Sequence, residues 1–490
     1  MRGIGWLFLL FASLPCAAGD YVVLSSVSKS AYDRAAQALA RHHEGAPIVP
    51  FDPADPEAVL PRLRELAPRY VAIVVHPEEI DVNSVRRILV MATKVDDDPF
   101  VDFEFAYVTG ASHEEALKFV ENIVRASKLQ TPLRVGHSPV YGGKTPCQAR
   151  DTELALGPLR FPERLVAFSP PDGKEGRDQK FVDANLKTLA GCGAILMGGH
   201  GMPWEVCSGA RAEDVARVDL FPAVVFNYAC HTGVTLRWLD EKFEKGDRVA
   251  RFAEIEAKKS FALSMIGAGA TGYVAYVNPR PAGPEMSTDF HRLLAGATLG
   301  ETRRRDYDKI VLGYVGFGEK GIVPPVLKDG GRKPQRELDI VRDMMLDAAT
   351  GGIAYGDPAF RPFPATPAAL PQSVEAQKDG ADLRVTFRVR ADFVFVWCID
   401  PFAQSAGDRR MLMKVCDRVE IPEGFEPDTV TVEAATFGET ALETLPVMHA
   451  LESDSGKRFL HIKLNWPQGA RVSGDVEVRV RIAGKTAAGK

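Results

Sequence analysis

Two short apolar segments of this chain end in residues that thiol-dependent hydrolysis requires. Residues 194–199 read AILMGG and lead into His200, and residues 223–229 read AVVFNYA and lead into Cys230. Each segment has the length and the β-branched content of a strand buried on both faces of a parallel sheet. Since the carboxyl ends of parallel strands line one crevice, neighbouring strands would bring an imidazole and a thiol together. The pair predicts a nucleophile and its proton-transfer partner.

Either residue alone has a simpler interpretation. A lone cysteine after a strand is usually a small buried hydrophobe, and a lone histidine there is often only hydrogen-bonded. Glycine on both sides of His200 favours the catalytic interpretation, because Gly201 leaves space for a substrate carbonyl. The N–H groups of Gly201 and Cys230 are the candidate donors of an oxyanion hole.

At these residues the chain resembles the gingipain-type cysteine peptidases, which belong to the caspase and legumain superfamily. The matching blocks are His200-Gly201, Ala229-Cys230 and the Cys-x-Thr-Gly of residues 230–233. A further block, Tyr355-Gly356-Asp357-Pro358-Ala359, is similar to the Gly-Asp-Pro that closes the peptidase domain in that family. The resemblance extends over residues 21–363 and is specific only at these blocks.

The resemblance implies the fold and the activity. The fold is α/β, with a caspase-like, mostly parallel sheet flanked by helices in two α/β subdomains, followed by a C-terminal immunoglobulin-like β-sandwich. The activity is peptide hydrolysis by a secreted cysteine endopeptidase, through a Cys230–His200 dyad and an acyl-enzyme, without a third catalytic residue. The expected partner is a protein or peptide substrate, with no cofactor and no metal.

Substrate specificity is less defined by the sequence. Arginine-cleaving gingipains use an acidic side chain upstream of the histidine, and the acid of the corresponding segment here is Asp151, which does not align cleanly. Met202 and Trp204, directly after the His-Gly step, are the other candidate pocket residues, because an aromatic ring offers a stacking wall. Ordinary loop packing explains them equally well.

Three alternatives to a peptidase stay open. His200, Cys207, Cys230 and His231 provide enough nitrogen and sulfur for tetrahedral zinc, although the close ligand pairs of known zinc motifs are missing. A catalytically inactive relative would act as a surface binding module. A transpeptidase, or sorting enzyme, of the same fold would resolve the acyl-enzyme with an amine instead of water.

Composition excludes several classes of protein. The formal net charge is −5, with 65 acidic and 60 basic residues interspersed. The sequence therefore shows no excess of basic residues of the kind that binds nucleic acids. Residues 1–19 read as a signal peptide, with an early arginine, a short apolar stretch and small residues at the end. No later stretch is long enough to anchor the chain in a membrane. We therefore expect export to the periplasm, the cell surface or the medium.

The chain has seven cysteines, of which Cys16 falls within the predicted signal peptide. So few thiols in a chain of this length indicate that hydrophobic cores, and not disulfides, stabilise the fold. Cys398 with Cys416 is one candidate disulfide, and Cys147 with Cys207 is a weaker one.

The order of strand-like and helical patterns along the chain predicts its division into domains. Strand-like runs at 21–24, 70–75 and 103–108 alternate with helical patterns, one of which opens with a capping box at Ser112. We assign residues 20–131 and 132–363 to the two α/β subdomains, 364–373 to a proline-rich linker, and 374–485 to the β-sandwich. The sandwich is predicted from alternating apolar residues at 383–389, 429–433, 459–464 and 476–482.

The segment after Cys230 carries a helical pattern from Phe252 to Met265, then the run GAGATG at 267–272, then a strand at 273–277. The glycines match Gly-x-Gly-x-x-Gly. A dinucleotide site requires that motif to follow a strand and open a helix, whereas here the order is reversed. We interpret the run as a helix end and a tight turn.

Overall fold

The structure is a computed structural model of the 490-residue chain. It describes residues 20–28, 32–129, 133–138, 147–151, 178–206, 209–244, 247–279, 285–316, 319–322, 324, 328–329, 332–334, 350–366, 370, 372–389, 395–397, 410–412, 415–437, 440–441, 447–454, 456–464 and 476–484. The predicted signal peptide therefore lies outside the described residues. Among the described residues, none of the helices has both the length and the apolarity to span a bilayer.

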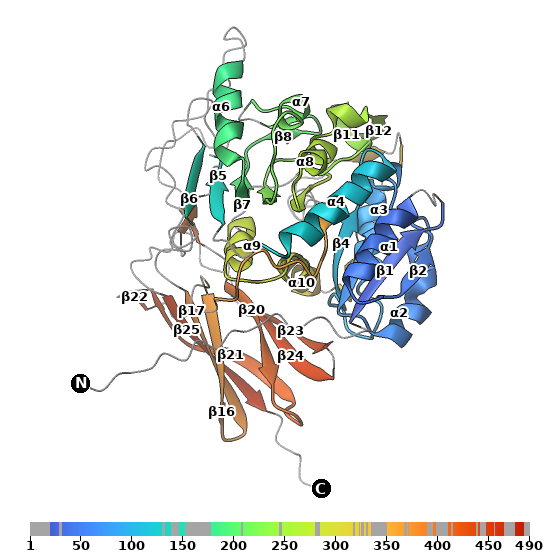
Figure 1. Cartoon of the computed structure of the whole chain (residues 1–490). Coiled ribbons are helices and arrows are strands. Elements are labelled where there is room, and N and C mark those ends of the chain that lie inside the picture. The colour runs from blue at the N-terminus through green and yellow to red at the C-terminus, as the bar shows by residue number, and fades with distance from the viewer. Residues whose placement is uncertain are drawn as a thin grey trace, which may run out of the picture.

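A ten-stranded sheet forms the centre of the α/β part (Figure 1). Its strands, in spatial order, are β2 (Ile48–Phe51), β1 (Tyr21–Ser26), β3 (Tyr70–Val74), β4 (Glu104–Val108), β15 (Gly352–Gly356), β13 (Gly272–Tyr276), β10 (Val224–Asn227), β7 (Cys192–Met197), β5 (Arg134–His137) and β6 (Gln148–Asp151). Most neighbouring strands are parallel, while β15 runs antiparallel to β13 and β6 antiparallel to β5.

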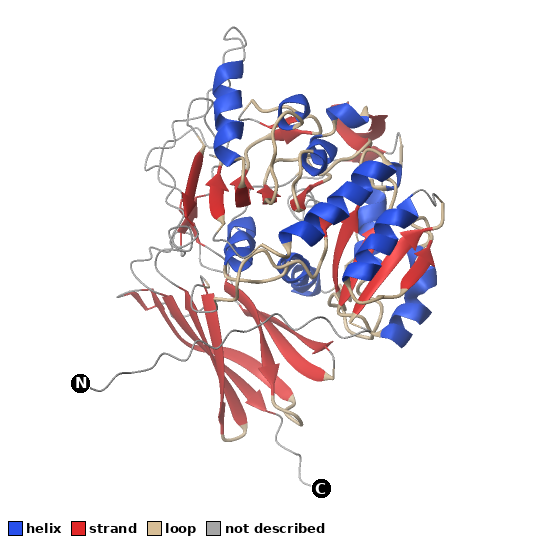
Figure 2. Ribbon diagram, viewed as in Figure 1, coloured by secondary structure: helices blue, strands red, loops and turns tan. Residues whose placement is uncertain are grey.

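Helices cover this sheet (Figure 2). They are α1 (Asp33–His42), α2 (Leu60–Leu66), α3 (Val82–Met91), α4 (His113–Ala126), α6 (Gln179–Leu189), α7 (Ala212–Val215), α8 (Phe261–Gly267), α9 (Glu285–Leu294) and α10 (Leu299–Gly316), with short 3-10 turns at Pro56–Val59, Pro77–Glu79 and Ala257–Lys259. Every residue of the seven strands β1, β3, β4, β7, β10, β13 and β15 is buried. Chemistry is therefore confined to the loops at the strand ends.

Both predicted α/β segments contribute to this one sheet. β4 from the first segment lies beside β15 from the second, with Tyr107 opposite Tyr355. A single hydrophobic core extends from Tyr21 to Phe363. The mostly parallel α/β architecture predicted from the sequence is confirmed.

Local sequence signals specify several of these elements. The strands predicted at 21–24, 70–75 and 103–108 are β1, β3 and β4. Ser112 caps α4 by accepting a hydrogen bond from the Glu115 N–H at 3.3 Å, and the Glu115 carboxylate accepts one from the Ala111 N–H at 3.1 Å. Both interactions satisfy backbone donors that the first helical turn leaves free.

The helix predicted from Phe252 to Met265 is mostly wrong. Residues 247–254 form β12, which pairs antiparallel with β11 (Arg237–Glu244) over eight residue pairs. Within the predicted segment the α-helix begins only at Phe261, after the 3-10 turn Ala257–Lys259. Cross-strand pairing, joined by β14 (Arg332–Pro334), overrides the helical spacing. The glycine run does end a helix: Gly269 has a φ of +97°, and β13 starts at Gly272.

The C-terminal part is a β-sandwich, as predicted. One sheet holds β16 (Gln372–Asp379), β17 (Asp382–Val389), β25 (Val476–Gly484), β21 (Pro427–Phe437) and β22 (Thr440–Ala441), and the other holds β20 (Val415–Ile421), β24 (Lys457–Leu464) and β23 (Val447–Asp454); β18 (Phe395–Trp397) and β19 (Arg410–Leu412) form a separate pair. Leu383, Val385 and Phe387 of β17 share a core with Leu460 and Ile462 of β24. The period-two pattern therefore marks the buried face.

A buried ion-pair network joins the sandwich to the α/β part. Asp417 of β20 accepts hydrogen bonds from Arg292 of α9 at 3.3 Å and from Arg305 of α10 at 2.6 Å. Arg304 of α10 reaches Glu452 of β23 at 2.7 Å, and both side chains are buried. Basic side chains of α9 and α10 thus pair with acidic side chains of β20 and β23.

The cysteines are consistent with a fold held by its cores. Cys147 and Cys192 are free and buried, and burial raises the pKa of both thiols. The weaker disulfide prediction, Cys147 with Cys207, is therefore wrong. Cys207 and Cys398 lie outside the described residues, so the Cys398–Cys416 pairing stays a prediction.

Candidate active site

The loops that carry His200 and Cys230 follow two neighbouring parallel strands. β7 pairs with β10 in a register that sets Met197 opposite Asn227, the last residues of the two strands. His200 lies three residues beyond β7 and is exposed, while Cys230 lies three residues beyond β10 and is half-buried. Both residues therefore follow the carboxyl ends of adjacent parallel strands, on the same side of the sheet.

The two loops also contact each other directly. The Tyr228 N–H donates a hydrogen bond to the Met197 carbonyl at 2.9 Å. A Cβ atom placed on Gly201 would lie 2.6 Å from the Ala229 Cβ and 2.9 Å from the Cys230 carbonyl oxygen. A Cβ on Gly198 would lie 2.7 Å from the Tyr228 Cβ. These approaches are too close for any residue other than glycine, so the glycines beside His200 let its loop pack against the Cys230 loop.

Side-chain hydrogen bonds shape the turn that carries Cys230. The Asn227 side chain accepts from the Ala229 N–H at 3.0 Å, and the Thr232 hydroxyl donates to the Ala229 carbonyl at 2.9 Å. Asn227, Ala229 and Thr232 are fully buried. His231, directly after the cysteine, has a φ of +58°, which turns the chain sharply at that point.

Two buried tyrosines on other strands of the sheet form hydrogen bonds with residues of this turn. The Tyr273 hydroxyl of β13 accepts from Asn227 Nδ2 and donates to the Thr232 carbonyl, both at 3.0 Å. The Tyr355 hydroxyl of β15 donates to the Gly233 carbonyl at 2.6 Å. Burial raises the pKa of both phenols, so they remain neutral donors. Sequence analysis named Tyr355 only as part of the Gly-Asp-Pro block and gave Tyr273 and Asn227 no role, because only the sheet order brings β13 and β15 close to β10.

An aromatic cluster lies next to the cysteine turn. Trp204 meets Trp238 of β11 edge to face, with ring centroids 5.7 Å apart, and His231 meets Trp238 in the same way at 5.4 Å. Burial lowers the pKa of His231 to about 4, so its imidazole is neutral at physiological pH. Its Nδ1 is buried without a hydrogen-bond partner. The cluster therefore packs against the Cys230 loop through His231.

The predicted pocket residues do not all lie together. Met202 belongs to the short β8 (Gly201–Met202), is half-buried, and pairs with Glu205 of β9 (Glu205–Val206). Asp151 is exposed at the end of β6, and the pairing sets it opposite Arg134, which is level with Cys192 at the start of β7. Met202 and Trp204 are therefore near the cysteine turn. Asp151 instead lies level with the start of β7, at the opposite end of the strands from His200 and Cys230.

Groups able to hold a metal ion occur elsewhere. Within the described residues, two sets of three such side chains have ligand atoms within 4.8 Å of one another: His42, His43 and Asp357, and Asp308, Glu452 and His461. Neither set contains His200, Cys230 or His231. Cys207, the fourth member of the alternative zinc set, is outside the described residues.

Comparison with known proteins gives structural likenesses only. No protein-family model and no curated protein sequence matches the chain. The chain is similar to the arginine-specific cysteine proteinase gingipain R (RgpB), at 11% identity over 78% of this chain and 90% of the other, with a TM-score of 0.42. It is also similar to the complex of Porphyromonas gingivalis RgpB pro- and mature domains, at 11% identity over 77% and 91% (TM-score 0.41). A third structure, named only as a protease, is 9% identical over 91% and 97% (TM-score 0.41).

Proposed function

We propose that this chain is a cysteine endopeptidase in which Cys230 attacks the scissile carbonyl and His200 serves the proton transfers. The observation that carries the proposal is the contact of the His200-Gly201 loop with the Ala229-Cys230 turn, at the shared carboxyl edge of β7 and β10. This arrangement puts a partly accessible thiol and an accessible imidazole on adjoining loops. Catalytic geometry often tightens only when substrate binds.

In this mechanism the Cys230 thiol gives its proton to His200 and its sulfur adds to the carbonyl carbon. The C–N bond then breaks, and the peptide nitrogen leaves with the proton that His200 took up. Water then adds to the acyl-enzyme and releases the acid and the free thiol. The N–H groups of Gly201 and Cys230 are the proposed donors to the oxyanion. Trp204 and Met202 line the adjoining substrate pocket. Asp151 has no place in it, because it lies at the other edge of the sheet.

Export through the predicted signal peptide remains part of this proposal, with peptides or proteins outside the cytoplasm as substrates. A transpeptidase would use the same residues and the same acyl-enzyme. Adding an amine nucleophile to the assay separates the two outcomes, since a transpeptidase forms the amide product in preference to the acid.

The test is mass spectrometry after labelling of the full chain with iodoacetamide and with an acyloxymethyl-ketone probe. We expect Cys230 to be labelled in preference to Cys147 and Cys192, because both of those thiols are buried. Cys230→Ala should abolish cleavage of a peptide library. His200→Ala should reduce turnover by about 10²–10⁴-fold if proton transfer is its whole contribution. The exposed His113 gives the control: His113→Ala should leave turnover unchanged. Cleavage that survives Cys230→Ala would overturn the proposal.

A further inference from the structure

Two histidines and a buried aspartate lie close together on the side of the sheet where β13 begins, at the opposite end of the strands from Cys230. His42 is the last residue of α1 and His43 follows it, while Asp357 follows β15 in the Gly356-Asp357-Pro358 block. β15 runs antiparallel to β13, and Gly356 pairs with Gly272 at the start of β13. Asp357 therefore lies near the amino ends of β13 and its parallel neighbours β10 and β7, away from the Cys230 turn that follows β10.

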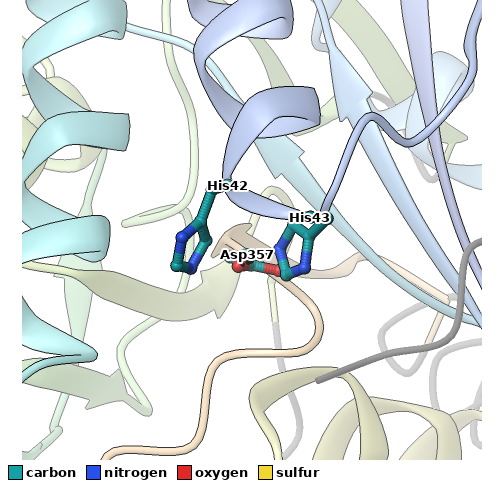
Figure 3. A group of neighbouring side chains, drawn as sticks. All are labelled: His42, His43 and Asp357. Atoms are coloured by element: carbon teal, nitrogen blue, oxygen red, sulfur yellow. Dashed lines mark hydrogen bonds and ion pairs between the residues drawn. The ribbon is translucent and has the colours of Figure 1, made fainter.

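The three side chains converge on one point (Figure 3). The two imidazoles flank the Asp357 carboxylate, and one ligand atom from each residue lies within 4.8 Å of the other two. The closest pair, His43 Nε2 and Asp357 Oδ2, is 2.7 Å apart. Tetrahedral coordination at about 2.0–2.1 Å places ligand atoms about 3.4 Å apart, so small side-chain movements suffice to admit an ion.

Neighbouring residues hold the group in place. Asp357 is 1% exposed, and its Oδ1 accepts from the Tyr21 hydroxyl at 2.8 Å and from the Ala359 N–H at 2.9 Å. The Tyr21 ring also stacks on the His43 ring, with centroids 3.7 Å apart and an interplanar angle of 14°. Outer residues that orient the ligands in this way are typical of metal sites in proteins. Both histidines are partly exposed, which leaves an entry path.

We propose that His42, His43 and Asp357 bind a zinc ion, with a water molecule as the fourth ligand. Imidazole nitrogen with one carboxylate suits zinc and its neighbours in the first transition series, whereas calcium and magnesium prefer oxygen ligands throughout. The ion would connect the end of α1 to Asp357, which lies 314 residues after His43 in the chain. Its role is structural, because the Cys230 turn lies at the other edge of the sheet. The sequence prediction of no metal did not include this site.

Zinc binding to the full chain carrying Cys230→Ala tests this site separately from the peptidase proposal, because the thiol that could also bind zinc is removed. Equilibrium dialysis with elemental analysis should give one zinc per chain. Addition of ZnCl2 should raise the melting temperature, whereas CaCl2 and MgCl2 should not. Failure of the peptidase assay would leave these measurements unaffected.

Substitution of His42 locates the ion. His42→Ala, made in the same background, should lower zinc affinity at least about 10-fold. The zinc-free chain should stay folded, since the described hydrogen bonds of Asp357 come from other residues and His42→Ala removes only the edge-to-face contact of its ring with His43. Asp357→Asn keeps an acceptor for Tyr21 but loses the charge, and should also weaken binding. His113→Ala is the matched control and should bind zinc as the parent does. No zinc at micromolar concentrations, or equal affinity in the His42→Ala chain, would overturn the proposal.

Discussion

The residues that touch the Cys230 turn are positioned by hydrogen bonds whose partners are buried. The Tyr273 hydroxyl is the centre of this set, because it joins Asn227 before the cysteine to Thr232 after it. Removing one partner of a buried hydrogen bond leaves the others unsatisfied and costs about 1–3 kcal/mol. The turn around Cys230 therefore depends on a residue that contacts no substrate.

We predict that Tyr273→Phe lowers the free energy of unfolding by about 1–3 kcal/mol and reduces turnover. Urea denaturation and peptide hydrolysis measure the two effects. Tyr107 of β4 gives the matched control, because its hydroxyl is buried without a hydrogen-bond partner. Tyr107→Phe should be neutral or slightly stabilising. Equal losses in the two variants would show that the Tyr273 hydroxyl has no special role.

His231 makes stability depend on pH in a defined window. Its pKa is about 4 in the folded protein because of burial, against about 6.5 for a free imidazole. The unfolded chain takes up a proton between these values, so the free energy of unfolding falls as the pH is lowered from about 6.5 to 4. The contribution present at neutral pH amounts to about 3 kcal/mol at most.

His231→Asn should remove that contribution, since asparagine does not titrate and tolerates the positive φ. Urea denaturation at several pH values measures it: the difference between parent and variant should vary between pH 4 and 6.5 and be constant above. The same substitution at the exposed His113 should leave the pH profile unchanged. A parallel profile for His231→Asn and the parent would contradict the assignment.

At the scale of elements, the site depends on how closely two loops approach. The parallel register of β7 and β10 brings the loops to one edge, and glycine lets them touch. The β11–β12 hairpin then adds Trp238 to the aromatic cluster that includes Trp204 and His231.

Gly201→Ala tests the loop contact. An added methyl group would lie 2.6 Å from the Ala229 Cβ, so the His200 loop must move away from the cysteine turn. We expect a loss of kcat/KM of about 10²-fold, the cost of an ångström-scale misplacement, with the far-ultraviolet circular dichroism spectrum unchanged. Gly267→Ala is the control, because its new methyl group would meet nothing closer than 3.8 Å. Full activity in the Gly201→Ala protein would show that the loop contact is not required.

At the scale of the whole molecule, buried charges connect the sandwich to the α/β part. Burial by itself raises the pKa of Asp417, but the guanidinium groups of Arg305 and Arg292 outweigh it and hold the pKa well below its usual value. A carboxylate with a lowered pKa contributes stability above pH 4, and that contribution is lost as the pH falls toward the folded-state pKa. The contact is therefore expected to weaken in strong acid.

Asp417→Asn should lower the free energy of unfolding by about 3–5 kcal/mol, because it leaves the buried Arg292 without its carboxylate. Urea denaturation at pH 7 checks this value. Arg388→Ala removes exposed ion pairs with Glu375 and Glu477 and should change stability by less than about 1 kcal/mol. Similar effects of the two substitutions would mean that the network does not stabilise the contact.

Local patterns in the sequence were sufficient for much of the fold. The apolar runs predicted β7 and β10, the capping residues predicted the start of α4, and the period-two alternation predicted β17 and its buried face. These features depend on neighbours in the chain, so short-range physics specifies them. The motif residues His200 and Cys230 were found in the same way, as the residues that follow two such runs.

Only the tertiary structure decided which distant segments meet. The order of strands brings the hydroxyls of Tyr273 and Tyr355 within hydrogen-bond distance of the cysteine turn. Pairing between β11 and β12 replaces most of a predicted helix. The same long-range packing brings Asp357 beside His42 and His43, and separates Asp151 from the cysteine. Residues hundreds of positions apart leave no periodic signal in the sequence, because their contact is fixed by burial of the common sheet and not by local propensity.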